Sequence, residues 1–269
     1  MSTYVALGSS YAAGPGIAPV ANAGALRSGR NYAHQIAGRL SLQLTDVTCS
    51  GATTANILRT PQRTFTGSMR PQIEAVASVT RLVTITAGGN DVAYIGALTK
   101  GSIASALAQR LSALPEQLTG RLRGAAGYRT RPGQFDAVTA SLTEIVRQVR
   151  ARAPKARVML VDYLTVLGPD ARTGTRLPLA AAQISEVRDT AAALAGAFAR
   201  AAALCGADLV KASEASAGHG LGSAEPWVTG FQFGNPFRSG PVPYHPNLAG
   251  MTAVAGLVAE QLRQADWQA

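Results

Sequence analysis

The chain has few cysteines, few lysines and few aromatic residues, and it contains no long apolar run. Its two cysteines, Cys49 and Cys205, are too few for a disulfide-dense scaffold, and their spacing matches no zinc-binding pattern. No apolar stretch reaches the ~18 residues that a membrane-spanning helix needs. Gly-Lys-Ser/Thr does not follow the first glycine-rich turn, which disfavours a phosphate-binding loop. The function therefore has to be sought in other side chains.

The N-terminus offers no room for a secretory signal peptide, because the first apolar run already begins at Tyr4. For the sequence as written, we expect a cytoplasmic protein whose two cysteines are reduced thiols. A secreted protein is expected instead if a leader has been removed, since the remaining chain would read the same.

The composition is basic, with a formal net charge of +10 that comes mostly from arginine. A basic surface attracts nucleic acid, anionic lipid or an acidic polymer. The arginines are scattered, however, and the densest group, at residues 147–157, fits a helix end followed by a turn. We therefore interpret the charge as a solvated face and expect no nucleic-acid partner. The hydrophobic content of 47% with 15% charged residues favours a compact globular protein.

Short apolar runs alternate with longer segments of helical periodicity. The run at residues 158–161 is apolar at every position, which is typical of a parallel strand buried on both faces. The alternation predicts an α/β fold in which helices cover both sides of a parallel sheet, and no domain boundary interrupts residues 1–269. The expected strands are 4–7, 44–48, 82–86, 158–163 and 208–210, and the expected helices are 31–40, 71–77, 135–152, 178–204 and 247–263.

Two segments are longer than the connections of such a fold require. We interpret residues 95–132, which carry a helical pattern and a basic stretch, as a helical insertion over one edge of the sheet. A solvated helical excursion and a mobile lid over a substrate cleft are both compatible with this pattern. Residues 213–244 are rich in glycine, proline and serine, and long loops of this kind carry function or cover the core.

Four polar or small residues follow the expected strands or begin the last helix. Ser10 follows the first strand, Gly51 the second and Asn90 the third, while His245 precedes the final helix. Ligands bind at the carboxyl ends of parallel strands, so we expect these residues to meet at one edge. A serine needs a neighbouring imidazole to take its proton, and fixed N–H donors stabilise the oxyanion that forms. The set therefore predicts acyl transfer through an activated serine.

Each of these residues also has a structural interpretation. Asn90 is a good helix cap, and a histidine before a helix is often structural. His219, Trp227 and Phe231 precede His245 in the long loop, and they are candidates for a substrate pocket. Packing in the core explains aromatic residues there equally well.

Four blocks of the sequence resemble those of the SGNH/GDSL hydrolase family. They lie at residues 7–14 (LGSSYAAG), 49–54 (CSGATT), 88–91 (GGND) and 245–247 (HPN), so the resemblance covers nearly the whole chain. It implies a flavodoxin-like three-layer α/β/α sandwich with a central parallel sheet of about five strands. It further implies that Ser10 is the nucleophile and His245 the general base, and that Ser10, Gly51 and Asn90 form the oxyanion hole. The implied activity is hydrolysis of carboxylic esters without a metal or other cofactor.

Two positions depart from the family pattern. Ser9 replaces the usual aspartate before the nucleophile, and Val242 stands where the acid of the triad is normally found. Without that carboxylate, the imidazole lacks the group that orients it and stabilises its cation. We expect the backbone carbonyl of Val242, in a segment stiffened by two prolines, to support the ring instead. A carboxylate from Asp91 or Glu225 is the less favoured substitute.

The expected substrate is a small-molecule or lipid ester. An acyltransferase or a carbohydrate deacetylase would use the same residues, because these reactions differ in the acceptor or the substrate and not in the nucleophile. A catalytically weak relative that only binds a ligand in the same cleft is the alternative from a different class. The sequence leaves the chain length of the acyl group and the oligomeric state open.

Overall fold

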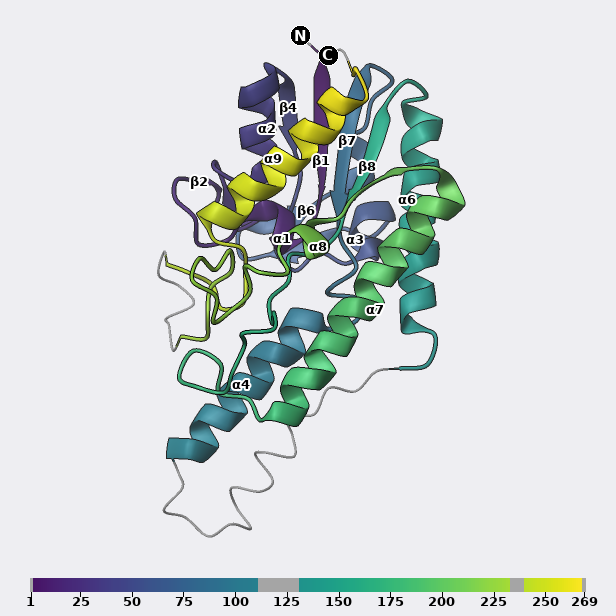
Figure 1. Cartoon of the computed structure of the whole chain (residues 1–269). Coiled ribbons are helices and arrows are strands. Elements are labelled where there is room, and N and C mark those ends of the chain that lie inside the picture. Colours follow the sequence, from purple (N-terminus) through teal and green to yellow (C-terminus); the bar gives the residue numbers. More distant parts are fainter. Residues whose placement is uncertain (1, 111–130, 233–239, 268–269) are drawn as a thin grey trace.

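A computed structural model describes residues 2–110, 131–232 and 240–267 and centres on a five-stranded sheet (Figure 1). The strand order is β4-β1-β7-β8-β9, and every neighbouring pair is parallel. This is the flavodoxin-like order, and the predicted parallel sheet is confirmed. The strands are β1 (Thr3–Gly8), β4 (Gln43–Asp46), β7 (Thr80–Thr86), β8 (Arg157–Val161) and β9 (Asp208–Val210).

Helices cover the sheet in two packed pairs. Helices α2 (Tyr32–Leu40) and α9 (Leu248–Gln264) pack together, and so do α6 (Gln134–Arg152) and α7 (Ala181–Cys205) (Figure 1). The apolar face of α6 is buried, because Val138, Leu142 and Val149 recur at helical spacing on its inner side. The result is the predicted three-layer α/β/α sandwich.

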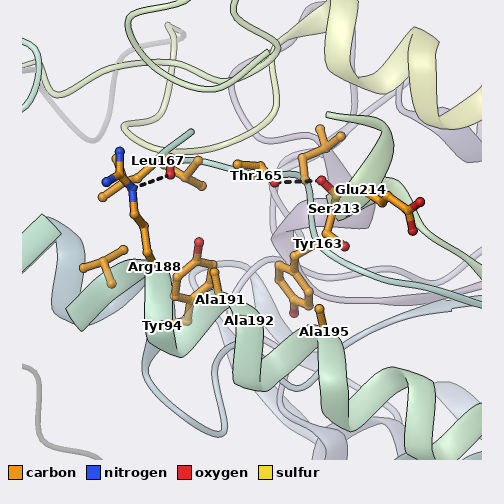
Figure 2. Close-up of a pocket in the computed structure, with 13 residues that line it drawn as sticks. Tyr94, Tyr163, Thr165, Leu167, Arg188, Ala191, Ala192, Ala195, Ser213 and Glu214 are labelled. Carbon is orange, nitrogen blue, oxygen red and sulfur yellow. Dashed lines mark hydrogen bonds between the residues drawn. The ribbon is translucent and has the colours of Figure 1, made fainter. Parts of the chain in front are cut away.

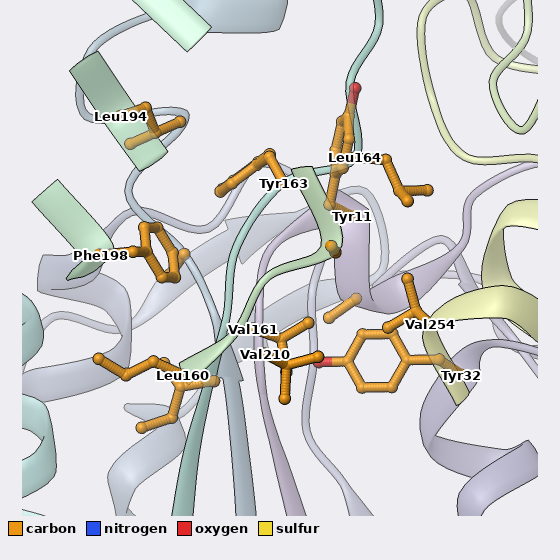
Figure 3. Packing of buried hydrophobic residues seen from close by; sticks show 14 of the residues in the cluster. Tyr11, Tyr32, Leu160, Val161, Tyr163, Leu164, Leu194, Phe198, Val210 and Val254 are labelled. Carbon is orange, nitrogen blue, oxygen red and sulfur yellow. The ribbon is translucent and has the colours of Figure 1, made fainter. Parts of the chain in front are cut away.

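The core fills the space on both sides of the sheet, and strand β8 shows this (Figure 3). Leu160 lies with Phe198 of α7 on one side, whereas the next residue, Val161, lies with Val254 of α9 on the other. Leu160, Val161 and Phe198 are each 0–1% exposed. Because successive strand residues point to opposite faces, a continuous apolar run buries both faces. Each such side chain contributes about 1.5–3 kcal/mol.

Several short elements connect the main ones, and the two hairpins among them were not expected from the sequence. The segment expected as a helix at 71–77 is a single 3₁₀ turn, because Val76 already returns to extended backbone on the way into β7. The short elements are α1 (Ser10–Ala13), α3 (Thr54–Leu58), η1 (Gln72–Ala75), α8 (Ala212–Ala215) and the hairpins β2 (Val20–Asn22) with β3 (Arg27–Ser28) and β5 (Gln62–Thr64) with β6 (Gly67–Met69).

The segment interpreted as an insertion begins with α4 (Tyr94–Arg110), which contacts α7 beyond the carboxyl ends of the strands (Figure 1). Residues 111–130 lie outside the described residues, so the extent of the insertion stays a prediction. Among the helices that the structure describes, none combines the length and the apolar character needed to span a membrane.

Candidate active site

The turn after β1 places the hydroxyl of Ser10 at the carboxyl edge of the sheet. Gly8 ends the strand where it must pass close to β7, since a Cβ atom there would lie 2.7 Å from the carbonyl oxygen of Thr86. The next N–H, that of Ser9, donates to the same carbonyl at 2.8 Å. Ser10 then opens the short helix α1. The strand-to-helix turn that carries this serine is thus built by a glycine and a main-chain bond.

His245 is held beside Ser10 by the loop that enters α9. The side chain of Asn247 caps α9 by accepting from the N–H of Gly250 at 2.9 Å, and it donates to the carbonyl of Pro226 at 2.6 Å. These contacts fix the chain directly after His245. Its Nε2 lies 2.9 Å from Oγ of Ser10. Residues 235 positions apart are therefore brought into hydrogen-bond contact.

The tautomer of His245 follows from the contact of its other ring nitrogen. Nδ1 lies 2.8 Å from the carbonyl oxygen of Pro243. A carbonyl oxygen only accepts, so Nδ1 carries the proton and Nε2 is the free acceptor. The hydroxyl of Ser10 accordingly donates to Nε2. This is the arrangement in which an imidazole takes the proton of an attacking serine.

The carbonyl that contacts the ring is that of Pro243, and the sequence-based choice of Val242 is wrong. The carbonyl of Val242 accepts from the backbone N–H of His245 at 3.2 Å and from the hydroxyl of Thr229. It thus closes a turn on the main chain, and both of these donors are groups other than the ring. Asp91, considered as a substitute acid, instead accepts from the N–H and hydroxyl of Thr54.

Burial lowers the pKa of His245 from 6.5 to about 4. The bond to the Pro243 carbonyl acts in the opposite direction, because it favours the protonated ring, but burial outweighs it. The imidazole is consequently neutral at pH 7. A neutral ring that hydrogen-bonds the serine is ready to accept a proton.

Three candidate oxyanion donors lie around Ser10. Gly51 has φ +83°, a conformation that favours glycine, and the preceding Ser50 donates its N–H to the carbonyl of Ala25 at 2.9 Å. The amide nitrogen of Asn90 donates one hydrogen to the carbonyl of Ala52 at 2.9 Å, which fixes the orientation of the side chain. The N–H of Ser10 lies at the start of α1.

Ser10, Gly51, Asn90 and His245 line one pocket of about 440 Å³. The sequence-predicted residues are therefore brought together at the carboxyl edge of the sheet. Apolar and aromatic side chains make up much of the remaining wall: Tyr11, Pro15, Leu26, Ile95 and Tyr163.

His219, Trp227 and Phe231 do not line this pocket, in contrast to their prediction as substrate contacts. The ring of His219 stacks on Trp227 with centroids 3.9 Å apart, and its Nδ1 contacts the carbonyl of Glu225 at 2.9 Å. Phe231 is 5% exposed and stacks on Tyr244. These aromatic residues pack within the loop that precedes His245.

Two tyrosines contribute to the site and were missed in the sequence. The hydroxyl of Tyr11 donates to the carbonyl of Tyr244 at 2.6 Å and so joins the nucleophile turn to the histidine loop. The hydroxyl of Tyr163 accepts from the N–H of Gly89 at 2.9 Å and contacts Oγ of Ser9 at 3.1 Å. Tyr163 lies two residues beyond the end of β8, so its position at a strand end was the available indication.

Tyr163 also lines a second cavity of about 280 Å³, between the segment after β8 and helix α7 (Figure 2). Small side chains of α7, including Ala191 and Ala195, form one wall. Neither Ser10 nor His245 lines this cavity, so we place the candidate active site in the first pocket.

We expect Asn90→Ala to lower kcat by about 10²–10³-fold, because one preorganised donor to the oxyanion is removed. KM changes less, since the donor acts mainly in the transition state. Asn90→Asp has the same size but replaces the donor with an acceptor, and it is expected to be at least as slow. Steady-state kinetics on p-nitrophenyl butyrate test this, with thermal unfolding to verify the fold. Full turnover in Asn90→Ala would remove this residue from the oxyanion hole.

The fold and the pocket define the class. Across residues 2–110, 131–232 and 240–267, no group of three His, Cys, Asp or Glu side chains is placed to hold a metal ion. A flavodoxin-like sheet with a serine, a histidine and amide donors at its carboxyl edge defines a candidate site for acyl transfer.

The sequence profile of the GDSL-like lipase/acylhydrolase family matches residues 6–253, and the chain belongs to this family. It is 37% identical to Lipase 2 of Streptomyces coelicolor, over 94% of this chain and 83% of that protein. The crystal structure of phospholipase A1 from Streptomyces albidoflavus NA297 has a TM-score of 0.73 and 23% identity, covering 96% of this chain and 98% of that one. An extracellular lipase from Streptomyces rimosus has a TM-score of 0.68 and 23% identity, with coverages of 97% and 99%. The resemblance predicted from the four sequence blocks is confirmed, and the protein is a carboxylic ester hydrolase.

Proposed function

We propose that the protein hydrolyses carboxylic esters through an acyl-enzyme on Ser10, with His245 as the general base. The observation that carries this proposal is the 2.9 Å contact between Nε2 of His245 and Oγ of Ser10 in a pocket shared with Gly51 and Asn90. Nucleophilic catalysis by serine requires that the base contact the serine hydroxyl and that the same pocket admit the substrate to both groups. The same contact supports a catalytic role over a role in ligand binding alone.

The reaction follows from these positions. Oγ of Ser10 attacks the carbonyl carbon as its proton passes to Nε2 of His245. The carbonyl oxygen becomes an oxyanion, which the N–H groups of Ser10 and Gly51 and the amide of Asn90 stabilise. The imidazolium then protonates the leaving alcohol, and the acyl group remains on Ser10. Water, deprotonated by His245, attacks this ester and frees the acid.

Main-chain support replaces the triad acid in this mechanism. The carbonyl of Pro243 holds the proton on Nδ1 and thereby keeps Nε2 available to Ser10. A carbonyl carries only a partial charge, so it stabilises the imidazolium less than a carboxylate does. The lowered pKa of His245 is consistent with this weaker support.

The largely apolar pocket favours an ester with an apolar acyl or alcohol group, and the relative named Lipase 2 agrees with such a substrate. Hydrolysis of p-nitrophenyl esters from acetate to long acyl chains, by wild type and Ser10→Ala side by side, tests the proposal. Activity that disappears with Ser10 supports it, and the chain-length profile measures the acyl pocket. A wild type that is inactive on the whole series contradicts it.

The neutral state of the half-buried His245 imidazole predicts an unusually acid-tolerant enzyme. Protonation of Nε2 removes the acceptor for the serine proton, so activity falls as the pH drops through the pKa. With that pKa lowered to about 4, kcat/KM is expected to be half-maximal near pH 4 and level from about pH 5 to pH 7. Circular dichroism at each pH excludes acid unfolding. A half-maximum near pH 6.5 would show that burial does not shift this imidazole.

A further inference from the structure

Among the described residues that line the active-site pocket, Lys100 is the one formally charged side chain besides His245. Lys100 lines the pocket, and no aspartate or glutamate lines it within the described part of the chain. His245 is neutral at pH 7, as shown above. The formal charge of the pocket wall is therefore that of one ammonium group.

Lys100 reaches the pocket from helix α4. Ile95, Gly96 and Thr99 line the same pocket, and their spacing from Lys100 places all four residues on one face of the helix. Lys100 is exposed, whereas Ser10 is only 8% exposed. The ammonium group therefore lies at the rim, and the nucleophile lies deeper in the pocket.

Lys100 is not neutralised by the protein within the described residues. Lys211 pairs with Glu214 at 3.0 Å, but no ion pair or hydrogen bond of Lys100 is found in the described part of the chain. Asp91 follows the lining residue Asn90, and its carboxylate is held by Thr54 on α3. The positive charge at the pocket is thus available to a bound molecule.

We propose that Lys100 selects esters that carry an anionic group, such as a carboxylate, sulfate or phosphate, at the rim of the pocket. This inference rests on the proposed ester hydrolysis, and it adds a substrate class to it. The ester carbonyl lies at Ser10. One end of the substrate, either the acyl or the alcohol group, then extends toward α4, and this end carries the anionic group. A lysine whose apolar stem merely covers the pocket wall would select no charge.

The test compares esters that differ only in charge. The alcohol-side pair is 4-carboxyphenyl butyrate and 4-carbamoylphenyl butyrate, and the acyl-side pair is the p-nitrophenyl esters of glutaric acid and of its monoamide. The measured quantity is the ratio of kcat/KM for the charged ester to that for the neutral one. Comparing this ratio between variants cancels the intrinsic reactivity of the esters.

Lys100→Met keeps the apolar stem and loses the charge. We expect it to lower the ratio about fivefold for either the alcohol-side or the acyl-side pair of esters, because one exposed ion pair has an effect of this size. Lys100→Arg restores the ratio, and Lys100→Glu lowers it further. Lys155→Met is the matched control, because Lys155 is exposed just before β8, at the amino end of the sheet. Salt at 0.5 M reduces the wild-type preference, since an exposed pair is screened.

Equal ratios in wild type, Lys100→Met and Lys155→Met overturn the inference while ester hydrolysis itself stands. A ratio lowered equally by Lys155→Met also overturns it, because net charge and not Lys100 would then select the substrate. If wild type hydrolyses none of the four esters, the proposed function fails, and the selection by Lys100 fails with it.

Discussion

Replacement of Ser10 by alanine is expected to lower kcat for p-nitrophenyl butyrate by about 10⁴–10⁶-fold. The hydroxyl is the group that forms the acyl-enzyme, and no other side chain contacts Nε2 of His245 among the described residues. The oxyanion donors and the pocket remain, so a small rate above that in water persists.

The fold of Ser10→Ala is expected to be intact, because the contacts that shape the turn are made by its neighbours. Both backbone groups of Gly8 bond to the side chain of Gln72, and the N–H of Ser9 bonds to Thr86. Thermal unfolding of the variant checks this. Ser185→Ala, which removes the same hydroxyl from an exposed position of α7, is the matched control and keeps full activity. A Ser10→Ala enzyme with more than about 1% of the wild-type kcat would contradict the proposed nucleophile.

The sheet was predictable because its strands carry a pattern that few other structures satisfy. Residues 158–161 are apolar on both faces, which is typical of a parallel strand between two layers of helices. The short hairpins carry no comparable pattern. Val20 in β2 is 58% exposed, so burial imposes no alternation there, and the pairing depends on turns instead.

Ser10 and His245, which the proposed chemistry needs most, were predicted from the sequence, but the carbonyl that contacts the His245 ring was not. Tyr244 is buried and has φ +62°, a conformation that is uncommon for a bulky residue. This reverses the local direction of the chain between Pro243 and His245. The Pro243 carbonyl then faces the ring, and the Val242 carbonyl closes the turn. Sequence patterns do not indicate a left-handed tyrosine.

The same tyrosine explains why Phe231 is not in the pocket. The hydroxyl of Tyr11 donates to the Tyr244 carbonyl, the hydroxyl of Ser102 contacts the Tyr244 hydroxyl at 2.5 Å, and Phe231 stacks on its ring. A strained residue persists only when its surroundings determine it in this way. These contacts fix the chain directly before His245, and the pocket wall comes from α1, α4, the loops after the strands and the segment that enters α9.

Replacement of His245 by alanine is expected to lower kcat about as much as the loss of Ser10, by about 10⁴–10⁶-fold, because a nucleophile and its base act as a unit. Without the imidazole, the Ser10 hydroxyl keeps its proton at neutral pH and is a weak nucleophile. His219→Ala is the matched control. It removes a histidine that stacks on Trp227 outside the pocket, so its kcat stays near that of wild type.

Added imidazole is expected to restore part of the activity of His245→Ala by entering the space that the side chain leaves, and to leave Ser10→Ala inactive. If His219→Ala were the slower variant, the base would be His219, and the contact between His245 and Ser10 would be structural.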